Sequence, residues 1–136
     1  MPYCTKADLI ERFGESELLA IARDESGMAI DTAVVERACE DASGEIDGYV
    51  SAAGYPVPLS PVPGVVIAKA CDIARYRLYD EHASEQVQKR YDDAVKFLRS
   101  VSRGEVKLGI STGPASSSAG SVQMNPGRQV FNGGGF

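Results

Sequence analysis

The side chains with the most reactive chemistry are one histidine and three cysteines, and their spacing predicts no catalytic or metal site. A nucleophile–base pair would need Cys39 or Cys71 beside His82 in an open pocket. Cys4, Cys39, Cys71 and His82 could formally supply four zinc ligands, but they form no CxxC pair and no other zinc-like spacing. We interpret the cysteines as small, partly buried hydrophobic residues in a reducing compartment, and His82 as a solvated turn residue.

Other patterns that can mark active sites also lack the required geometry. The adjacent carboxylates Glu40–Asp41 and Asp92–Asp93 are expected on helices, where neighbouring side chains point about 100° apart and do not converge. No helix follows the glycines at 133–135 and no lysine accompanies them, so they are not a phosphate loop. The sequence therefore predicts no enzyme, no cofactor and no metal.

Charge is distributed unevenly along the chain. The 136 residues carry a net charge of −5, and Arg128 is the only charged side chain after residue 110, so residues 1–110 carry −6. An acidic surface disfavours ordinary nucleic-acid binding, although DNA could slide past it without being held. No basic recognition helix is present. No apolar run approaches the ~20 residues of a membrane span and no signal segment is seen, which favours a cytoplasmic protein without a membrane partner.

Hydrophobic periodicity predicts an all-α fold, a small bundle of about four helices. A capping box at Thr5 and Asp8 should begin the first helix and Gly14 should end it, with a short helix following to about residue 22. Asp31 and Ser84 are expected to cap helices that reach about residues 53 and 102. The helix over residues 65–80 is apolar around much of its circumference and should be central.

Finer features of these helices can also be predicted. Small residues in the middle of the helix after Asp31 should let another helix approach closely, and Gly48 should have a packing reason, because glycine costs about 1 kcal/mol relative to alanine there. Supporting i,i+4 ion pairs are expected between Glu85 and Lys89 and between Asp92 and Lys96.

A proline-rich connector, residues 54–64, separates two of the helices. Its prolines forbid a helix and favour an extended path. It could serve as a ligand for a proline-binding groove, or it could wrap around its own domain. We favour the wrap, because it would bury Val57, Leu59 and Val62.

The chain is predicted to consist of a helical domain, residues 1–110, and a Gly/Ser-rich extended C-terminal tail, residues 111–136. Residues 105–110 alternate polar and apolar and are expected to form a short extended arm. The tail has too little apolar surface to offset chain entropy and would be ordered by its partners. The candidate interface residues are Tyr55, Pro56, Val57 and Leu59 in the connector and Arg128, Val130, Phe131 and Phe136 in the tail.

Five stretches together resemble a known family. They are residues 8–14 (DLIERFG), 45–49 (EIDGY), 54–59 (GYPVPL), 70–76 (ACDIARY) and 90–98 (RYDDAVKFL). In this order they resemble the small protein encoded among the head-morphogenesis genes of Mu-like phages and prophages. The resemblance covers most of residues 1–110 and not the tail. That family is similar to the helical head–tail connector (adaptor) proteins of long-tailed phages.

The resemblance implies a structural subunit of the virion neck that is made in the host cytoplasm. Roughly twelve copies would form a ring beneath the portal protein, with a stopper or tail-terminator protein as the next partner and DNA as weakly contacted cargo. The family has no catalytic residues to transfer. Two alternatives remain open: a stopper or tail-completion protein of the same particle, with about six copies, and a non-viral helical interaction protein.

Overall fold

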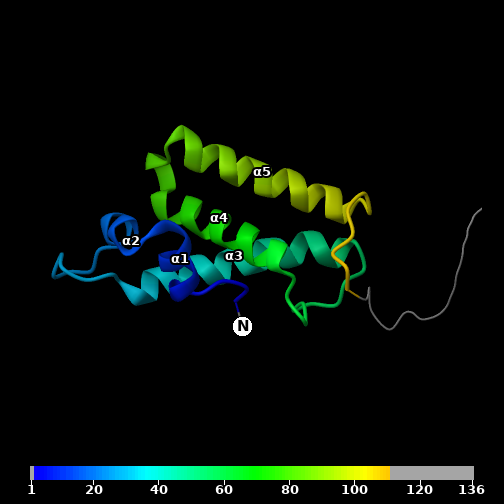
Figure 1. Ribbon diagram of the computed structural model, residues 1–136, viewed down its shortest axis with the longest axis horizontal. Helices are drawn as coiled ribbons and strands as arrows, with labels where there is room; N and C mark the ends of the chain where they lie inside the picture. The colour runs from blue at the N-terminus through cyan, green and yellow to red at the C-terminus, as the bar shows by residue number, and fades with distance from the viewer. Residues whose placement is uncertain (1, 111–136) are drawn as a thin grey trace, which may run out of the picture.

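The computed structural model describes residues 2–110, and these residues form an all-α domain, as predicted (Figure 1). The elements are α1 (Lys6–Phe13), α2 (Glu15–Ile21), α3 (Thr32–Ala52), α4 (Gly64–Tyr79), the 3-10 turn η1 (Asp80–His82) and α5 (Glu85–Ser102). The five α-helices correspond to the five helical segments predicted one by one, and Gly14, with a φ of 95°, separates α1 from α2 as predicted, so the summary figure of about four helices is one too low. Within the described residues, pairing of the β type is limited to one isolated bridge, between Arg23 and Ile30.

Side-chain caps begin three helices at the predicted residues. Thr5 Oγ1 accepts a hydrogen bond from the N–H of Asp8 at 3.2 Å, and the Asp8 carboxylate accepts one from the N–H of Thr5 at 3.0 Å. Asp31 and Ser84 accept hydrogen bonds from backbone N–H groups in the first turns of α3 and α5. These caps satisfy backbone donors that a helix leaves free at its N-terminus.

α4 is the central helix, which confirms the prediction for residues 65–80. It lies between α3 and α5 in Figure 1 and contacts both, together with α1. The buried side chains of α4 occupy several sides of the helix: Val66, Ala70, Cys71, Ile73, Ala74 and Arg75. Because α4 is surrounded, the hydrophobic core extends along its length, with Leu9 and Leu18 of the short helices covering one end.

Three finer predictions are wrong: the packing reason for Gly48 and the two i,i+4 ion pairs, Glu85–Lys89 and Asp92–Lys96. A β-carbon at Gly48 would meet no atom within 4 Å, so nothing in the domain requires glycine there. The Lys89 ammonium pairs with the carboxylate of Asp93 at 3.1 Å instead of Glu85. Asp92 accepts a hydrogen bond from Gln88 at 3.1 Å, and no pair with Lys96 forms among the described residues.

Candidate functional site and interaction surfaces

Two tyrosine hydroxyl groups attach the connector to the domain. Tyr3 accepts a hydrogen bond from the N–H of Leu59 at 2.8 Å and donates one to the carboxylate of Asp47 on α3. Burial, and then Asp47, raise the pKa of Tyr3 to about 12, so this hydroxyl remains a donor at neutral pH. Tyr55 accepts from the N–H of Leu108 at 2.9 Å. The path of the connector is therefore held at two points.

The predicted interface residues of the connector do not all face solvent. Tyr55 and Leu59 are buried in the domain core. Pro56 is exposed, and the Val57 side chain is 43% exposed, so the expectation that the wrap buries Val57 is wrong. Val62 is half-buried against the core. Arg128, Val130, Phe131 and Phe136, the candidates in the tail, lie outside the described residues.

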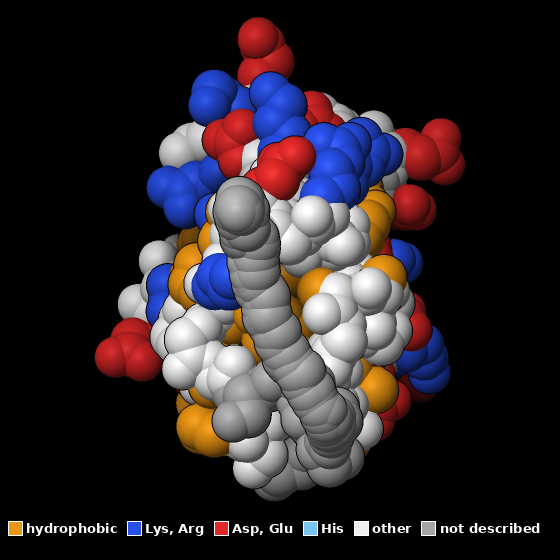
Figure 2. Space-filling model, turned by 90° about the vertical axis from the view of Figure 1, so that its right-hand side faces the viewer, with side chains coloured by type: hydrophobic (Ala, Val, Ile, Leu, Met, Phe, Trp, Pro, Cys, Tyr) orange, Lys and Arg blue, Asp and Glu red, His pale blue; other side chains and the backbone are white. Residues whose placement is uncertain are grey.

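The exposed part of the connector lies at one end of the molecule. Figure 2 looks onto this end and shows hydrophobic side chains in its middle, with lysine and arginine side chains above them that are interspersed with acidic ones. Val65, at the start of α4, is 40% exposed and adds to the apolar surface of Pro56 and Val57. We call residues 54–65 and 99–110 the connector end.

Residues 105–110 return along the domain instead of leaving it. Leu108 is buried, while Val106 and Ile110 are partly buried and pack against the core. Figure 1 shows this segment beside the connector. The predicted arm therefore belongs to the folded domain, and residues 105–110 contain no strand.

The three cysteines come together in the core, which their sequence spacing did not indicate. Cys4, Cys39 and Cys71 are free thiols and all are buried. The neighbouring thiols of Cys39 and Cys71, and then burial, raise the pKa of Cys4, so its thiol stays protonated. His82 is exposed in η1, as predicted. In the part of the chain that the structure describes, no group of three or more His, Cys, Asp or Glu side chains could hold a metal ion.

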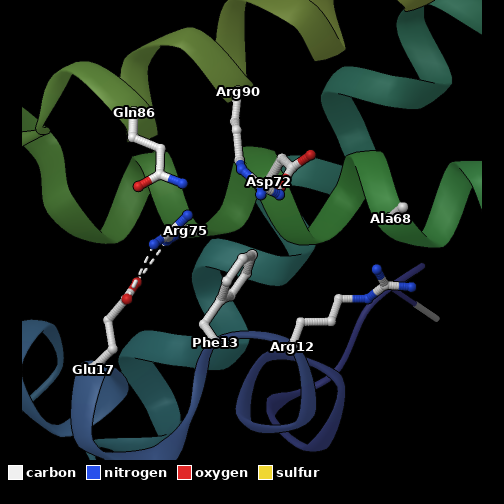
Figure 3. Close-up of a pocket in the computed structure, with 8 residues that line it drawn as sticks. All are labelled: Arg12, Phe13, Glu17, Ala68, Asp72, Arg75, Gln86 and Arg90. Atoms are coloured by element: carbon white, nitrogen blue, oxygen red, sulfur yellow. Dashed lines mark hydrogen bonds and ion pairs between the residues drawn. The ribbon is translucent and has the colours of Figure 1, made fainter.

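A charged pocket of about 370 Å³ lies where α1 and α2 meet α4 and α5 (Figure 3). Arg75, almost fully buried, donates from Nε and Nη2 to the two carboxylate oxygens of Glu17 at 2.5 and 3.0 Å. Its guanidinium also lies 4.2 Å from the centre of the Phe13 ring. Such a bidentate, stacked arginine joins the short helices to α4.

The negative charge of the second carboxylate in this pocket, Asp72, is less well balanced by its basic neighbour than that of Glu17. Asp72 lies 3.7 Å from the guanidinium of Arg90, beyond ordinary hydrogen-bond distance. Burial raises the pKa of Asp72, although Arg90 and Lys69 oppose this effect. Both carboxylates lie against arginines, and the residues that line the pocket include neither histidine nor cysteine. The arrangement joins helices and offers no evident acid–base or nucleophilic couple.

A second polar junction connects the three long helices. Glu45 of α3 accepts hydrogen bonds from Arg77 of α4 at 2.7 Å and from the hydroxyl of Tyr91 on α5 at 3.0 Å. Burial, followed by Glu45, raises the pKa of Tyr91 to about 12. The Tyr91 ring stacks on Tyr76 with their centres 4.0 Å apart. Periodicity alone does not identify such contacts, since each joins separate helices.

Comparison with known proteins identifies relatives of this domain. The family model described as Bacteriophage Mu, Gp36 matches residues 3–125. The chain is 38% identical over 109 residues to the Mu-like prophage FluMu protein gp36 of Haemophilus influenzae, covering 80% of this chain and 77% of the relative. It is 33% identical over 135 residues to Gene product J of Escherichia phage Mu, covering 97% and 95% of the two chains.

These matches define an all-α protein of Mu-like bacteriophages. The chain belongs to the bacteriophage Mu Gp36 family, and the resemblance noted in the sequence is confirmed. The match continues to residue 125, whereas the resemblance identified from the sequence stops near Ile110. Among the described helices, none combines the length and the apolar character needed to cross a membrane.

Proposed function

We propose that this chain is a structural protein of the phage particle, a head–tail connector (adaptor) whose copies form a ring beneath the portal. Membership of the Mu Gp36 family is the observation that carries the proposal. The chemistry of the described domain is consistent with it, because the pocket carboxylates lie against arginines and the thiols are buried. We infer an assembly role without enzymatic activity.

The partners follow from the same proposal. Further copies of the chain would complete the ring, the portal protein would lie on one side, and a stopper or tail-terminator protein on the other. The net charge of −6 on residues 1–110 supports a channel that DNA crosses with little binding, since like charges repel. Residues 111–136, with one charged side chain, are proposed to contact these partners through Val130, Phe131 and Phe136.

The test is to co-express the chain with its portal protein and determine the stoichiometry of the purified complex by mass measurement and electron microscopy. A ring of roughly twelve copies on the portal is the expected result. A ring of about six copies would favour a stopper instead. A chain that stays monomeric and never co-purifies with portal or tail components would contradict the proposal.

A further inference from the structure

Among the described residues, the large hydrophobic side chains that stay exposed lie at two opposite ends of the domain. Met28 is 85% exposed, Val57 is 43% exposed and Val65 is 40% exposed. Met28 belongs to the loop of residues 22–31 between α2 and α3, which lies at the far left of Figure 1. Val57 and Val65 belong to the connector end on the other side. Between the two ends, the described residues include no other exposed large hydrophobic side chain.

The loop that carries Met28 is an ordered turn. The N–H of Asp24 donates to the carbonyl of Ala29 at 2.9 Å, and the N–H of Asp31 donates to the carbonyl of Ala22 at 2.7 Å. The Asp24 carboxylate accepts hydrogen bonds from the hydroxyl of Ser26 at 2.6 Å and from the N–H of Gly27 at 3.1 Å. An apolar side chain on a prearranged turn loses little conformational entropy on binding.

The two ends also carry opposite charge. Residues 22–31 and 80–85, which we call the loop end, lie on the same side of Figure 1. Their ionisable groups give a net charge of −5, with the histidine counted as neutral: Arg23, Asp24, Glu25, Asp31, Asp80, Glu81 and Glu85. The connector end carries +2, from Arg99, Arg103 and Lys107 against Glu105. Opposite charges around apolar centres are the complementarity expected of two surfaces that bind each other.

We propose that copies of this chain bind one another end to end, with the loop end and Met28 of one copy against the connector end, Val57 and Val65, of the next. The occupant is a second copy because the two complementary surfaces lie on one molecule. The surfaces differ, so the contact is heterologous and each added copy leaves one free surface of each kind. Such a series of copies either closes into a ring or continues as an open filament. The end-to-end contact does not depend on the proposed function, and only the closure into a ring rests on it.

Charge reversal at each end provides the test. The loop-end variant carries Glu25→Lys with Glu81→Lys, and the connector-end variant carries Arg103→Glu with Lys107→Glu. All four side chains are exposed, and none of them forms an ion pair with another described residue. The loop-end variant reduces the negative charge of its loop end from −5 to −1 against an unchanged connector end of +2, and the connector-end variant has two negative ends, of −5 and −2. A matched control, Glu40→Lys with Asp41→Lys, makes the same charge change as the loop-end variant, at exposed positions in the middle of α3.

Self-association is measured by light scattering at low ionic strength, where surface charges are least screened, with circular dichroism to show that each variant is folded. The wild type and the α3 control should associate, and each end variant alone should associate at least tenfold more weakly. An equimolar mixture of the two end variants should recover association as pairs, because the unaltered loop end of the connector-end variant meets the unaltered connector end of the loop-end variant. A mere folding defect would not be recovered by mixing.

The outcomes separate this inference from the proposed function. If wild-type rings form and both end variants form them equally well, the end-to-end contact is wrong while the connector role stands. If association follows the charge pattern but gives open filaments even with the portal present, the contact is right and the ring is wrong. If the wild type remains monomeric with and without the portal, both proposals fail.

Discussion

The Tyr55 hydroxyl accepts a hydrogen bond from the backbone N–H of Leu108 at 2.9 Å, although 53 positions separate the two residues. The bond joins the connector to the segment that follows α5. Both residues are buried, so water is a poor substitute for either partner. The connector end is therefore an organised surface, with its exposed side chains Pro56 and Val57 carried on a fixed backbone.

Tyr55→Phe should lower the free energy of unfolding by about 1–3 kcal/mol, because it leaves the buried N–H of Leu108 without its acceptor. Urea unfolding followed by circular dichroism measures the change. Tyr49→Phe is the matched control, since its half-buried ring forms no hydrogen bond with the described residues. Equal effects of the two substitutions would show that the Tyr55 hydroxyl contributes nothing specific.

The bidentate pair between Glu17 and Arg75 should contribute more to the free energy of unfolding than a surface ion pair does. Glu17→Ala leaves a nearly buried guanidinium uncompensated, and we expect it to cost about 3 kcal/mol, at the low end for a buried pair because Glu17 is 23% exposed. The double variant Glu17→Ala with Arg75→Met should cost less than the two single changes added together. Additive costs from urea unfolding would mean that the two side chains do not interact.

Local features of this fold could be predicted from the sequence, and contacts between distant residues could not. The caps at Thr5, Asp31 and Ser84 depend on neighbouring residues, and all three were predicted. The cysteine cluster and the Glu17–Arg75 pair join residues on separate elements, and no spacing rule encodes them. The connector shows both cases: its prolines excluded a helix, but only packing determines that Leu59 is buried and Val57 is exposed.

The prediction that packing requires glycine at position 48 failed, and the substitution Gly48→Ala tests this result. Its position is exposed and a β-carbon there would meet nothing, so Gly48→Ala should stabilise the isolated chain by up to about 1 kcal/mol through helix propensity. Gly14→Ala is the contrasting variant and should destabilise, because Gly14 has a φ of 95°. A loss of stability in Gly48→Ala, measured by thermal unfolding, would reveal a contact absent from the described domain.

Asp72 should make stability depend on pH. Burial raises the pKa of its carboxyl above the ordinary value of 3.8, so the unfolded chain releases this proton more readily than the folded one. The free-energy penalty for keeping the Asp72 carboxylate ionised in the folded protein increases as pH rises from 3.8 to the raised pKa, and it remains at neutral pH. Asp72→Asn should therefore stabilise the protein at pH 7, and the gain should shrink as pH falls towards 4 in urea titrations, whereas exposed Asp41→Asn should show no such trend. A gain that is constant with pH would exclude ionisation as its cause.

Two truncations test where the folded domain ends. Removing residues 111–136 should change the free energy of unfolding by less than about 0.5 kcal/mol, because every side chain of the described core lies within residues 3–110, yet it should impair ring assembly. Removing residues 105–136 should cost roughly 3 kcal/mol more, because Leu108 leaves the core and Tyr55 loses its hydrogen-bond donor. Circular dichroism during thermal and urea unfolding measures both. If the shorter deletion destabilises the monomer as much as the longer one, residues beyond 110 belong to the core, and the proposed division of the chain at that point is wrong.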